Sequence, residues 1–391
     1  MADTDPPVFE RVRAVFEENF ASGREVGAAL SIWKDGREVV NLCAGFRDAG
    51  RQHPWHEGTL ALIWSATKGL AAACALQAIE RAGLEMETAV CRFWPEFGVA
   101  GKADLTLGDV LSHRAGLGAL DATDLSILDH EAVVRAIECQ PPLWRPEDGP
   151  GYGPRTFGCI VDEIVRRLAG IPLGDYWRRE FADPLALELW IGLPESKHAR
   201  VATMLAARAT GDEVRTPFLE AFADPASLTR RAFVTPGGLH AVSAMNSPAA
   251  RSASIPSMGG IGTASALAKF YAMLALGGRW NGRTYFGDKA VGWMTTRRSQ
   301  GFDKVLRLET SFSAGFMMDP LDARKCKIRR LLGPSLSAFG HPGAGGSLGF
   351  ADPENGIGFG YVMNQMESGV LPKERATNLV RTLYEPSAMP A

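Results

Sequence analysis

The chain has 391 residues, of which 46% are hydrophobic and 22% are charged, and its formal net charge is -2. This composition excludes disordered and fibrous proteins, because it supplies enough apolar side chains for a large core. The lysines and arginines are scattered along the chain, which argues against nucleic acid as a partner and favours a small molecule as the substrate.

A membrane partner is not predicted either. The longest nearly apolar run, Gly69 to Ile79, is shorter than a membrane-spanning helix requires. The segment from Met1 to Pro7 lacks the basic start and apolar core of a signal peptide, so we expect a cytoplasmic protein. The six cysteines have no C-x-x-C spacing and are expected to be reduced and mostly buried in the core. They are Cys43, Cys74, Cys91, Cys139, Cys159 and Cys326.

The first predicted elements are a helix and a hairpin. Residues 8–20 carry apolar side chains at helical spacing, and residues 27–46 are typical of two strands joined at Lys34-Asp35-Gly36. An alanine-rich helix follows Ser65 and is expected to end at Gly83.

Residues from about 85 to 250 are predicted to be mainly helical. Weak periodicity with several prolines and glycines predicts long loops between residues 212 and 256. The helices expected before those loops span residues 107–113, 130–139, 157–168 and 173–181.

The last part of the chain returns to a mixture of helices and strands. Helices are expected at residues 262–276 and 374–384, and Asn355-Gly356 has the signature of a tight hairpin turn. Strands are expected near residues 312–318, 347–351 and 357–364.

This pattern predicts an α/β fold combined with an all-α part. Residues 1–84 and 251–391 would form one discontinuous α/β domain, and residues 85–250 would form a mainly helical domain inserted into it. The helix that follows Ser65 would then begin at the cleft between the two domains.

Ser65-Ala66-Thr67-Lys68 is a Ser-x-x-Lys motif at this helix start. Residues three apart on a helix have Cβ atoms about 5–6 Å apart, so a desolvated Lys68 amine can reach the Ser65 hydroxyl and accept its proton. The unpaired N–H groups of a helix start favour negative charge, so the Ser65 N–H can face an oxyanion. Taken alone, the same spacing is also typical of a solvated lysine on a helix.

Two later segments could complete such a site. Pro150-Gly151-Tyr152-Gly153-Pro154 presents Tyr152 between glycines, directly before a predicted helix. Residues 339–347 open a predicted strand, and their small side chains would let a substrate approach the backbone closely. Each segment by itself is more typical of an ordinary turn.

In this order and at these separations, the three segments resemble the serine β-lactamase and DD-peptidase superfamily. The resemblance is closest to the class C β-lactamase-like carboxylesterases of family VIII, and it covers nearly the whole chain. It implies an antiparallel sheet flanked by helices, with an inserted helical domain and the active site in the cleft between them. Further matching segments are Leu105–Leu117, Arg166-Arg167-Leu168, Pro184-Leu185 and Trp190–Pro194.

The resemblance implies a serine carboxylesterase that hydrolyses short-chain esters. Ser65 would be the nucleophile, and Lys68 and Tyr152 would act together as general base and then as general acid. The N–H groups of Ser65 and Ala344 would form the oxyanion hole. The strand segment would line the substrate cleft with His341, Gly343 and Gly345.

Two departures from the lactamase pattern favour esters over β-lactams. Pro154 stands where β-lactamases and peptidases carry an asparagine, and His341-Pro342-Gly343 stands in place of Lys-Thr-Gly. Both missing groups would contact amide or carboxylate functions of a β-lactam. Weak hydrolysis of activated cephalosporin-like substrates is therefore expected only as a side activity.

Ser347 offers a rival nucleophile, because Gly345 to Gly349 matches the Gly-x-Ser-x-Gly elbow of α/β-hydrolases. That fold places its catalytic histidine after the serine, and no histidine follows His341 here. His53 and His56 are not spaced as metal ligands on one helical face, so neither a metal nor an organic cofactor is predicted.

The roles of two other histidines stay open between alternatives. His113 is expected to cap the end of a helix and to form part of the cleft floor, in preference to acting as a general base. His341 would either polarise the substrate or hold Tyr152 or its loop in place.

Other functions of the same fold are compatible with this sequence. A β-lactamase, a DD-peptidase-like hydrolase or an acyltransferase would use the same nucleophile. A sensor module of a different class would bind an acyl group without turnover and keep a stable adduct. A small-molecule ester is the expected partner, and a homo-oligomer is also compatible with the sequence.

Overall fold

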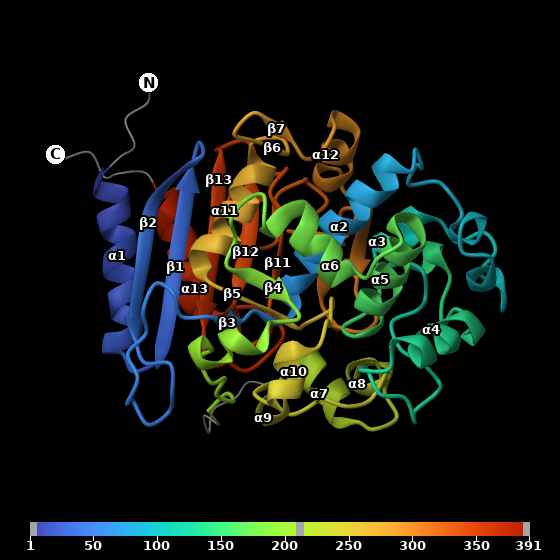
Figure 1. Cartoon of the computed structure of the whole chain (residues 1–391), viewed down its shortest axis with the longest axis horizontal. Helices are drawn as coiled ribbons and strands as arrows, with labels where there is room; N and C mark the ends of the chain where they lie inside the picture. Colours follow the sequence, from blue (N-terminus) through green and yellow to red (C-terminus); the bar gives the residue numbers. More distant parts are fainter. Residues whose placement is uncertain (1–5, 209–214, 386–391) are drawn as a thin grey trace.

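An eight-stranded antiparallel sheet combines strands from both ends of the chain. The computed structural model describes residues 6–208 and 215–385, and its strand order is β2-β1-β13-β12-β11-β10-β9-β8 (Figure 1). In that order the strands span Arg37–Gly45, Gly27–Lys34, Ile357–Met363, Leu348–Asp352, Phe339–Pro342, Met317–Met318, Glu309–Phe312 and Ser299–Phe302.

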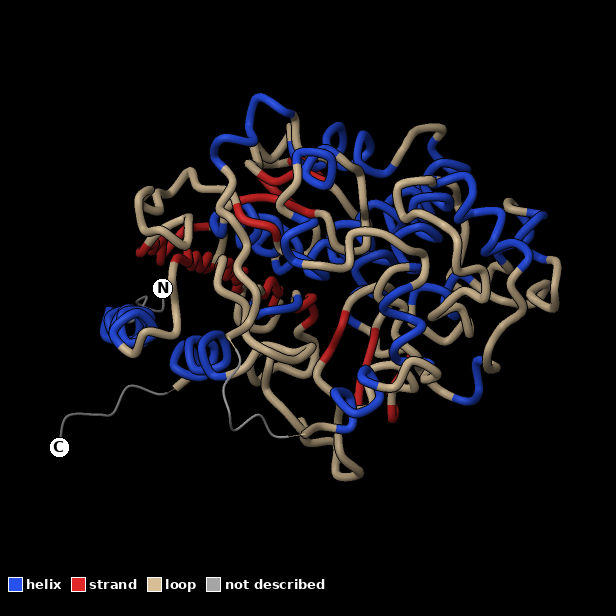
Figure 2. Tube along the Cα trace, turned by 90° about the horizontal axis from the view of Figure 1, so that it is seen from below, coloured by secondary structure: helices blue, strands red, loops and turns tan. Residues whose placement is uncertain are grey.

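Helices cover both faces of this sheet. On one face, α1 (Pro6–Ala21) and α13 (Glu374–Tyr384) pack together over an apolar cluster that includes Leu30 and Phe359. On the other face, α11 (Ala264–Ala275) contacts β1, β12 and β13. Figure 2, in which α1 and α13 are seen end-on beside the strands, shows the layers clearly.

Two glycines of β13 explain how closely α11 approaches the sheet. A Cβ on Gly358 would lie 2.3 Å from the Ala272 nitrogen, and one on Gly360 would lie 2.5 Å from the Ala264 oxygen. Real Cβ atoms do not come that near to backbone atoms, so only glycine fits between strand and helix at these positions.

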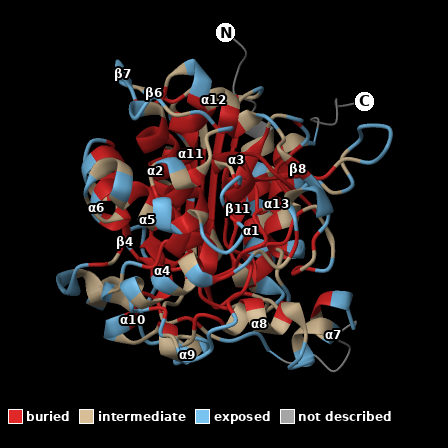
Figure 3. Ribbon diagram, turned by 90° about the vertical axis from the view of Figure 1, so that its right-hand side faces the viewer, coloured by how far each residue is buried: buried red, intermediate tan, exposed pale blue. Residues whose placement is uncertain are grey.

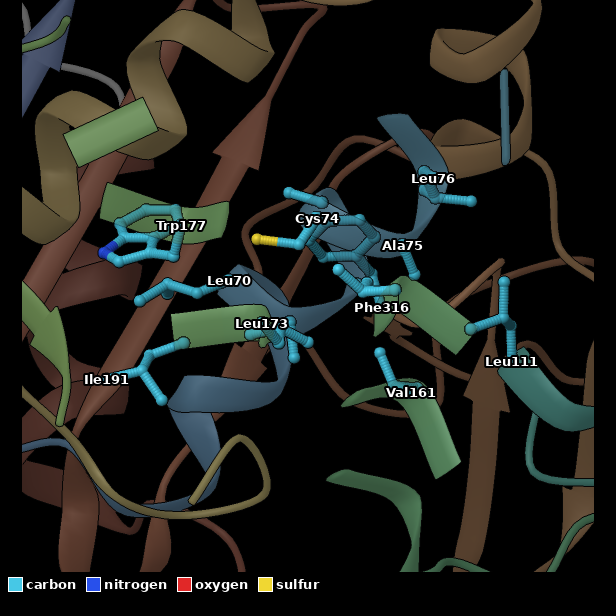
Figure 4. Close-up of a cluster of buried hydrophobic side chains, with 14 of the residues drawn as sticks. Leu70, Cys74, Ala75, Leu76, Leu111, Val161, Leu173, Trp177, Ile191 and Phe316 are labelled. Atoms are coloured by element: carbon cyan, nitrogen blue, oxygen red, sulfur yellow. The ribbon is translucent and has the colours of Figure 1, made fainter. Parts of the chain in front are cut away.

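The helix after Ser65, α2 (Thr67–Arg81), forms the centre of the main core. Its alanines and Leu70 are buried on all sides, and α5 and α6 pack against it (Figure 4). Buried residues are concentrated along α2, α11 and β11 in Figure 3. The start of α2 is therefore held on a rigid support.

The predicted helices of the middle segment are confirmed, with small shifts at their ends. They are α3 (Leu107–Leu111), α4 (His130–Cys139), α5 (Thr156–Ala169) and α6 (Leu173–Trp177), which continues as a π-helical turn (Arg178–Ala182). The division of the chain into domains at residues 84/85 and 250/251 stays a prediction.

The expectation of long loops from 212 to 256 is wrong over most of that segment. Short helices occupy it, with N-cap hydrogen bonds from Thr216, Ser227 and Ser247. With only four to seven residues each, they are too short to show a helical period in the sequence. They are α7 (Pro217–Ala223), α8 (Leu228–Val234), α9 (Val242–Met245) and α10 (Pro248–Ser252). Residues 209–214 lie outside the described part of the chain.

Near the C-terminal end, the single strand predicted at 312–318 is interrupted. The segment holds the end of β9, a turn at residues 313–316 and then β10, which pairs antiparallel with β9. The other two predicted strands and both predicted helices are confirmed. Short elements that the pattern missed include β3 (Ala61–Leu62), β4 (Leu189–Ile191), β5 (Gly260–Gly262), β6 (Arg279–Trp280), β7 (Arg283–Thr284), α12 (Asp288–Thr295) and β8 of the main sheet.

The cysteines differ from their predicted burial. All six are free thiols, but only Cys74 and Cys159 are buried, whereas Cys139 and Cys326 are exposed. Spacing alone cannot report burial, so the prediction of mostly buried thiols is wrong. Among the described residues, no helix is both long enough and apolar enough to cross a membrane.

Candidate active site

Ser65 lies in a short 3-10 turn (Trp64–Ala66) between β3 and α2. The α-helix begins at Thr67, two residues later than the sequence predicts, and the 3-10 turn runs straight into it. Trp64 has φ +49°, in the left-handed region that bulky side chains rarely adopt. The chain thus bends sharply just before Ser65 and leaves the Ser65 side chain partly exposed.

Lys68 is completely buried and its amine faces Ser65. The Nζ–Oγ distance to Ser65 is 3.4 Å, and Nζ also donates to the carbonyl oxygens of Pro154 at 2.9 Å and Ser257 at 2.8 Å. Nζ lies 4.8 Å from the centre of the Tyr152 ring. The structure therefore brings together Ser65, Lys68 and Tyr152, as the sequence predicts.

The loop that carries Tyr152 is fixed by two groups that the sequence reasoning did not assign to it. The carboxylate of buried Asp303 accepts the Tyr152 N–H at 3.1 and 3.0 Å. His113 accepts the Gly153 N–H on Nδ1 at 3.2 Å, and its backbone oxygen accepts the Gly151 N–H at 2.9 Å. Both neighbours of Tyr152 are thus tied to one histidine.

His113 does not cap a helix, so that part of its prediction is wrong. Ser112 is the C-cap of α3, and His113 follows with φ +60°. Its ring packs 4.9 Å from the Tyr152 ring and 4.6 Å from the Phe157 ring. The expected place in the cleft floor stays a prediction. Burial, with Lys68 nearby, holds the pKa of His113 well below its usual value, so this imidazole is neutral.

Burial sets the protonation of the two groups next to Ser65. It holds the pKa of Lys68 well below its usual range, with a smaller effect from the Arg155 charge. Burial also raises the pKa of Tyr152, and a hydrogen bond with the Ser65 side chain opposes that shift. Both shifts favour the uncharged form of the side chain, a free amine at Lys68 and a phenol at Tyr152.

A pocket opens over Ser65 and encloses about 330 Å³, including its mouth. Ser65, Tyr152, His341 and Ala344 all line it, so four predicted site residues meet there. The rest of its wall is apolar and consists of Phe233, Leu306, Met317, Pro342, Val370 and Leu371. Much of that volume is open to solvent, and the enclosed space next to Ser65 is small.

Gly343 and Gly345 are not part of this wall. A Cβ on Gly343 would lie 2.2 Å from the Ile63 oxygen, and one on Gly345 would lie 2.5 Å from the Met366 side chain. Gly345 also has φ +82°. The structure assigns both glycines to close packing within the protein, in place of the substrate contact expected from the sequence.

Ser347 points away from the pocket. It is fully buried, and its hydroxyl donates to the Ile63 oxygen at 2.8 Å. That oxygen also accepts the Ala66 N–H, so it keeps a partner if the hydroxyl is lost. The position of Ser347 agrees with its rejection as a nucleophile.

We therefore expect Ser347→Ala to keep ester hydrolysis within about twofold of wild type. The lost hydrogen bond should lower stability by about 1 kcal/mol and the melting temperature by about 1 °C. Initial rates and thermal unfolding of the purified variant check this. A rate loss of a hundredfold or more in a folded variant would contradict the assignment.

A buried charge cluster supports the turn that follows His341. Arg375 of α13 donates to the Gly345 oxygen at 3.2 Å and to the Gln365 oxygen at 2.8 Å. Its guanidinium contacts the carboxylates of Glu25 at 2.6 Å and Glu367 at 3.0 Å. The backbone next to Ala344 is thus held from behind by an ion cluster.

Comparisons with known proteins agree with this arrangement. The family model described as Beta-lactamase matches residues 12–383. The chain belongs to the Beta-lactamase family. Esterase/beta-lactamase LipL of Mycobacterium tuberculosis is 31% identical over 375 residues, which cover 95% of this chain and 84% of LipL.

Two solved structures extend the similarity within the Beta-lactamase family. A penicillin-binding protein homolog from Caulobacter crescentus is 36% identical with a TM-score of 0.85, and a family VIII carboxylesterase is 33% identical with a TM-score of 0.84. Each comparison covers 97% of both chains. The protein is therefore a hydrolase with the β-lactamase fold, and its neighbours include family VIII carboxylesterases.

In this member of the Beta-lactamase family, sequence reasoning missed Asp303, Arg375 and the contacts of His113. No local motif surrounds Asp303 or Arg375, and each acts on a segment far away in the sequence. His53 is paired with Asp48 at 3.1 Å on the surface. Within the described ranges, no group of three or more histidine, cysteine or acidic side chains is placed to hold a metal ion.

Proposed function

We propose that the chain is a serine carboxylesterase that hydrolyses short-chain esters through an acyl group on Ser65. The environment of the Lys68 amine carries the proposal. Two of its contacts are carbonyl oxygens, which can only accept hydrogen bonds, and the third is the Ser65 hydroxyl. A neutral amine would donate its two N–H groups to the carbonyls and turn its lone pair toward Ser65.

The proposed reaction begins when Ser65 Oγ attacks the ester carbonyl and its proton moves to Lys68. The 3.4 Å separation is long, as is common before substrate binds. The N–H groups of Ser65 and Ala344 would hold the oxyanion, each worth on the order of 3 kcal/mol in the transition state.

Collapse of the tetrahedral intermediate breaks the bond to the leaving oxygen. Burial keeps Tyr152 a phenol, its hydroxyl is hydrogen-bonded to the Ser65 side chain and its ring centre lies 4.8 Å from Lys68 Nζ. It would give its proton to the departing alcohol and regain one from Lys68. Water then attacks the acyl group with the same two residues as base and acid, and Ser65 is released with a free carboxylic acid.

Several features favour a neutral ester as the substrate. The pocket is small and mostly apolar, and Lys68 is the amine that the mechanism uses, not a fixed cation for a carboxylate. Pro154 offers its carbonyl to Lys68 where a β-lactamase would present asparagine. Weak cephalosporin hydrolysis would be a side activity, and we place the enzyme in the cytoplasm.

Intact-protein mass spectrometry with peptide mapping tests this proposal during turnover of p-nitrophenyl butyrate, with a cephalosporin run in parallel. We expect a transient butyryl group on the peptide that contains Ser65, together with continued release of nitrophenol. Ser65→Ala is the control and should show no adduct. The ratio of the two turnover rates gives the β-lactam hydrolysis relative to ester hydrolysis.

The other outcomes would separate the rival functions. A permanent adduct on Ser65 without turnover would favour a sensor module. Turnover with the acyl group on another residue would exclude the proposed nucleophile. Transfer of the butyryl group to an added alcohol in preference to water would favour an acyltransferase.

A further inference from the structure

The imidazole of His341 lies in the pocket wall in a defined protonation state. It belongs to β11 and is 1% exposed. Its Nδ1 lies 2.7 Å from the Pro342 carbonyl oxygen, which can only accept, so the proton is on Nδ1. In a neutral ring the other nitrogen, Nε2, is then a hydrogen-bond acceptor.

The surroundings keep this ring neutral. Burial and the nearby Lys68 lower the pKa of His341 to about 3, and no carboxylate is among the groups that affect it. Lys68, Tyr152 and His113 are titratable side chains near its ring, and the buried phenol of Tyr271 lies against the His341 backbone. The ring therefore differs from the lysine of a Lys-Thr-Gly strand, because it presents a lone pair instead of a positive charge.

Nε2 has no hydrogen-bond partner among the described residues, and it is buried. The Tyr152 ring centre is 5.9 Å from that of His341, and no hydrogen bond joins the two side chains. The apolar residues that make up most of the wall offer no N–H or O–H group to Nε2. A buried acceptor without a partner is costly, so a ligand that supplies a donor gains affinity there.

We propose that His341 Nε2 is a hydrogen-bond-accepting subsite that selects neutral esters with a hydroxyl or amide N–H near the scissile carbonyl. This inference rests on the proposed esterase function and names its substrate class. The donor could come from the acyl part or from the alcohol part of the ester. A substrate carboxylate would face a lone pair and be disfavoured.

Two matched substrate pairs test the subsite and distinguish the two sources. p-Nitrophenyl 3-hydroxybutanoate and 3-methylbutanoate exchange a hydroxyl for a methyl group on the acyl part. 2-Hydroxyethyl butanoate and propyl butanoate do so on the alcohol part. In wild type we expect kcat/KM to favour the hydroxyl in at least one pair by about fivefold to a hundredfold.

The variants His341→Phe and His341→Gln test whether that preference comes from Nε2. In His341→Phe, which keeps a ring but no acceptor, the ratio within the pair should fall to about one. His341→Gln can place an amide oxygen near the position of Nε2 and should restore part of the preference for the hydroxyl substrate. Each variant is compared with itself on two substrates, so a general loss of activity does not change the ratio.

The outcomes distinguish this inference from the function on which it rests. Equal turnover of both members of both pairs by wild type would overturn the subsite and leave the esterase intact. A hydroxyl preference that survives in His341→Phe would also overturn it. If none of the four esters is hydrolysed through Ser65, the proposed function fails and the subsite fails with it.

Discussion

Ser65→Ala should lower kcat/KM for p-nitrophenyl butyrate by about 10⁴-fold or more, and Lys68→Met should lower it by about 10²–10⁴-fold. Alanine removes the attacking oxygen, whereas methionine keeps a long side chain but has no lone pair that can accept the Ser65 proton. Because the two residues act in one step, the double variant should be about as slow as Ser65→Ala alone.

The pH profile gives this prediction a second readout. Lys68 accepts a proton only as a free amine, so wild-type kcat/KM should rise with pH as Lys68 loses its proton. Burial lowers the pKa of Lys68, so this rise occurs below the usual lysine value of 10.5. The residual activity of Lys68→Met should not rise with pH in this way. Initial rates of both proteins, measured over the same range of pH, test this.

Lys102→Met is a matched control for this substitution. Lys102 is also buried, and its amine donates to the carbonyls of Val99, Glu138 and Gln140, away from the pocket. The control should lose stability but keep the activity of its folded fraction. If folded Lys68→Met retained more than a tenth of wild-type activity, Lys68 would not be the base.

Arg375→Met should destabilise the fold by about 3–5 kcal/mol, which corresponds to a melting temperature about 4–6 °C lower in a chain of this size. The Arg375 side chain is 2% exposed and that of Glu25 is fully buried. Removal of the cation leaves the Glu25 and Glu367 carboxylates close together without compensation. Thermal unfolding measures the effect.

The loss should be larger at pH 8 than at pH 5.5. Burial raises the pKa of Glu25 from 4.5 to about 7, although Arg375 opposes that shift. A carboxyl group with a raised folded-state pKa contributes stability below its unfolded pKa and loses it as the pH rises through the folded value. Without Arg375 that folded-state pKa rises further, so deprotonation costs more in the variant.

Arg381→Met is the control on the same helix. The Arg381 side chain is 68% exposed and pairs with Glu385 at 3.4 Å. Exposed pairs of this kind contribute at most about 1 kcal/mol. A melting temperature for Arg375→Met that is no lower than that of Arg381→Met would show that the buried cluster does not stabilise the turn beside Ala344.

The sequence was sufficient for the parts of the site that depend on local spacing. Ser65 and Lys68 lie three residues apart, so any helical turn brings them together, and the periodicity of α2, α4 and α13 is long enough to detect. The fold class followed from strands and helices at both ends of the chain and from the resemblance. The family match confirms the resemblance, and the antiparallel sheet confirms the fold class.

Contacts between distant segments could not be predicted in the same way. Asp303 meets Tyr152 across 151 positions, and neither residue type nor spacing signals that contact. The glycines at 343 and 345 suggested access for a substrate, but the atoms that fill the space come from Ile63 and Met366. A glycine in the sequence indicates that other atoms approach the backbone closely, but it does not indicate whether those atoms belong to a substrate or to the protein.

The order of strands in the sheet has a consequence for biosynthesis. Ala28 of β1 pairs with Met363 of β13, so this edge of the first hairpin stays without its partner until most of the chain has been made. Unpaired strand edges can recruit other chains, and contacts between such distant positions form slowly. Folding of the nascent chain therefore competes with aggregation at β1, and whatever covers that edge in the meantime influences the yield of active protein.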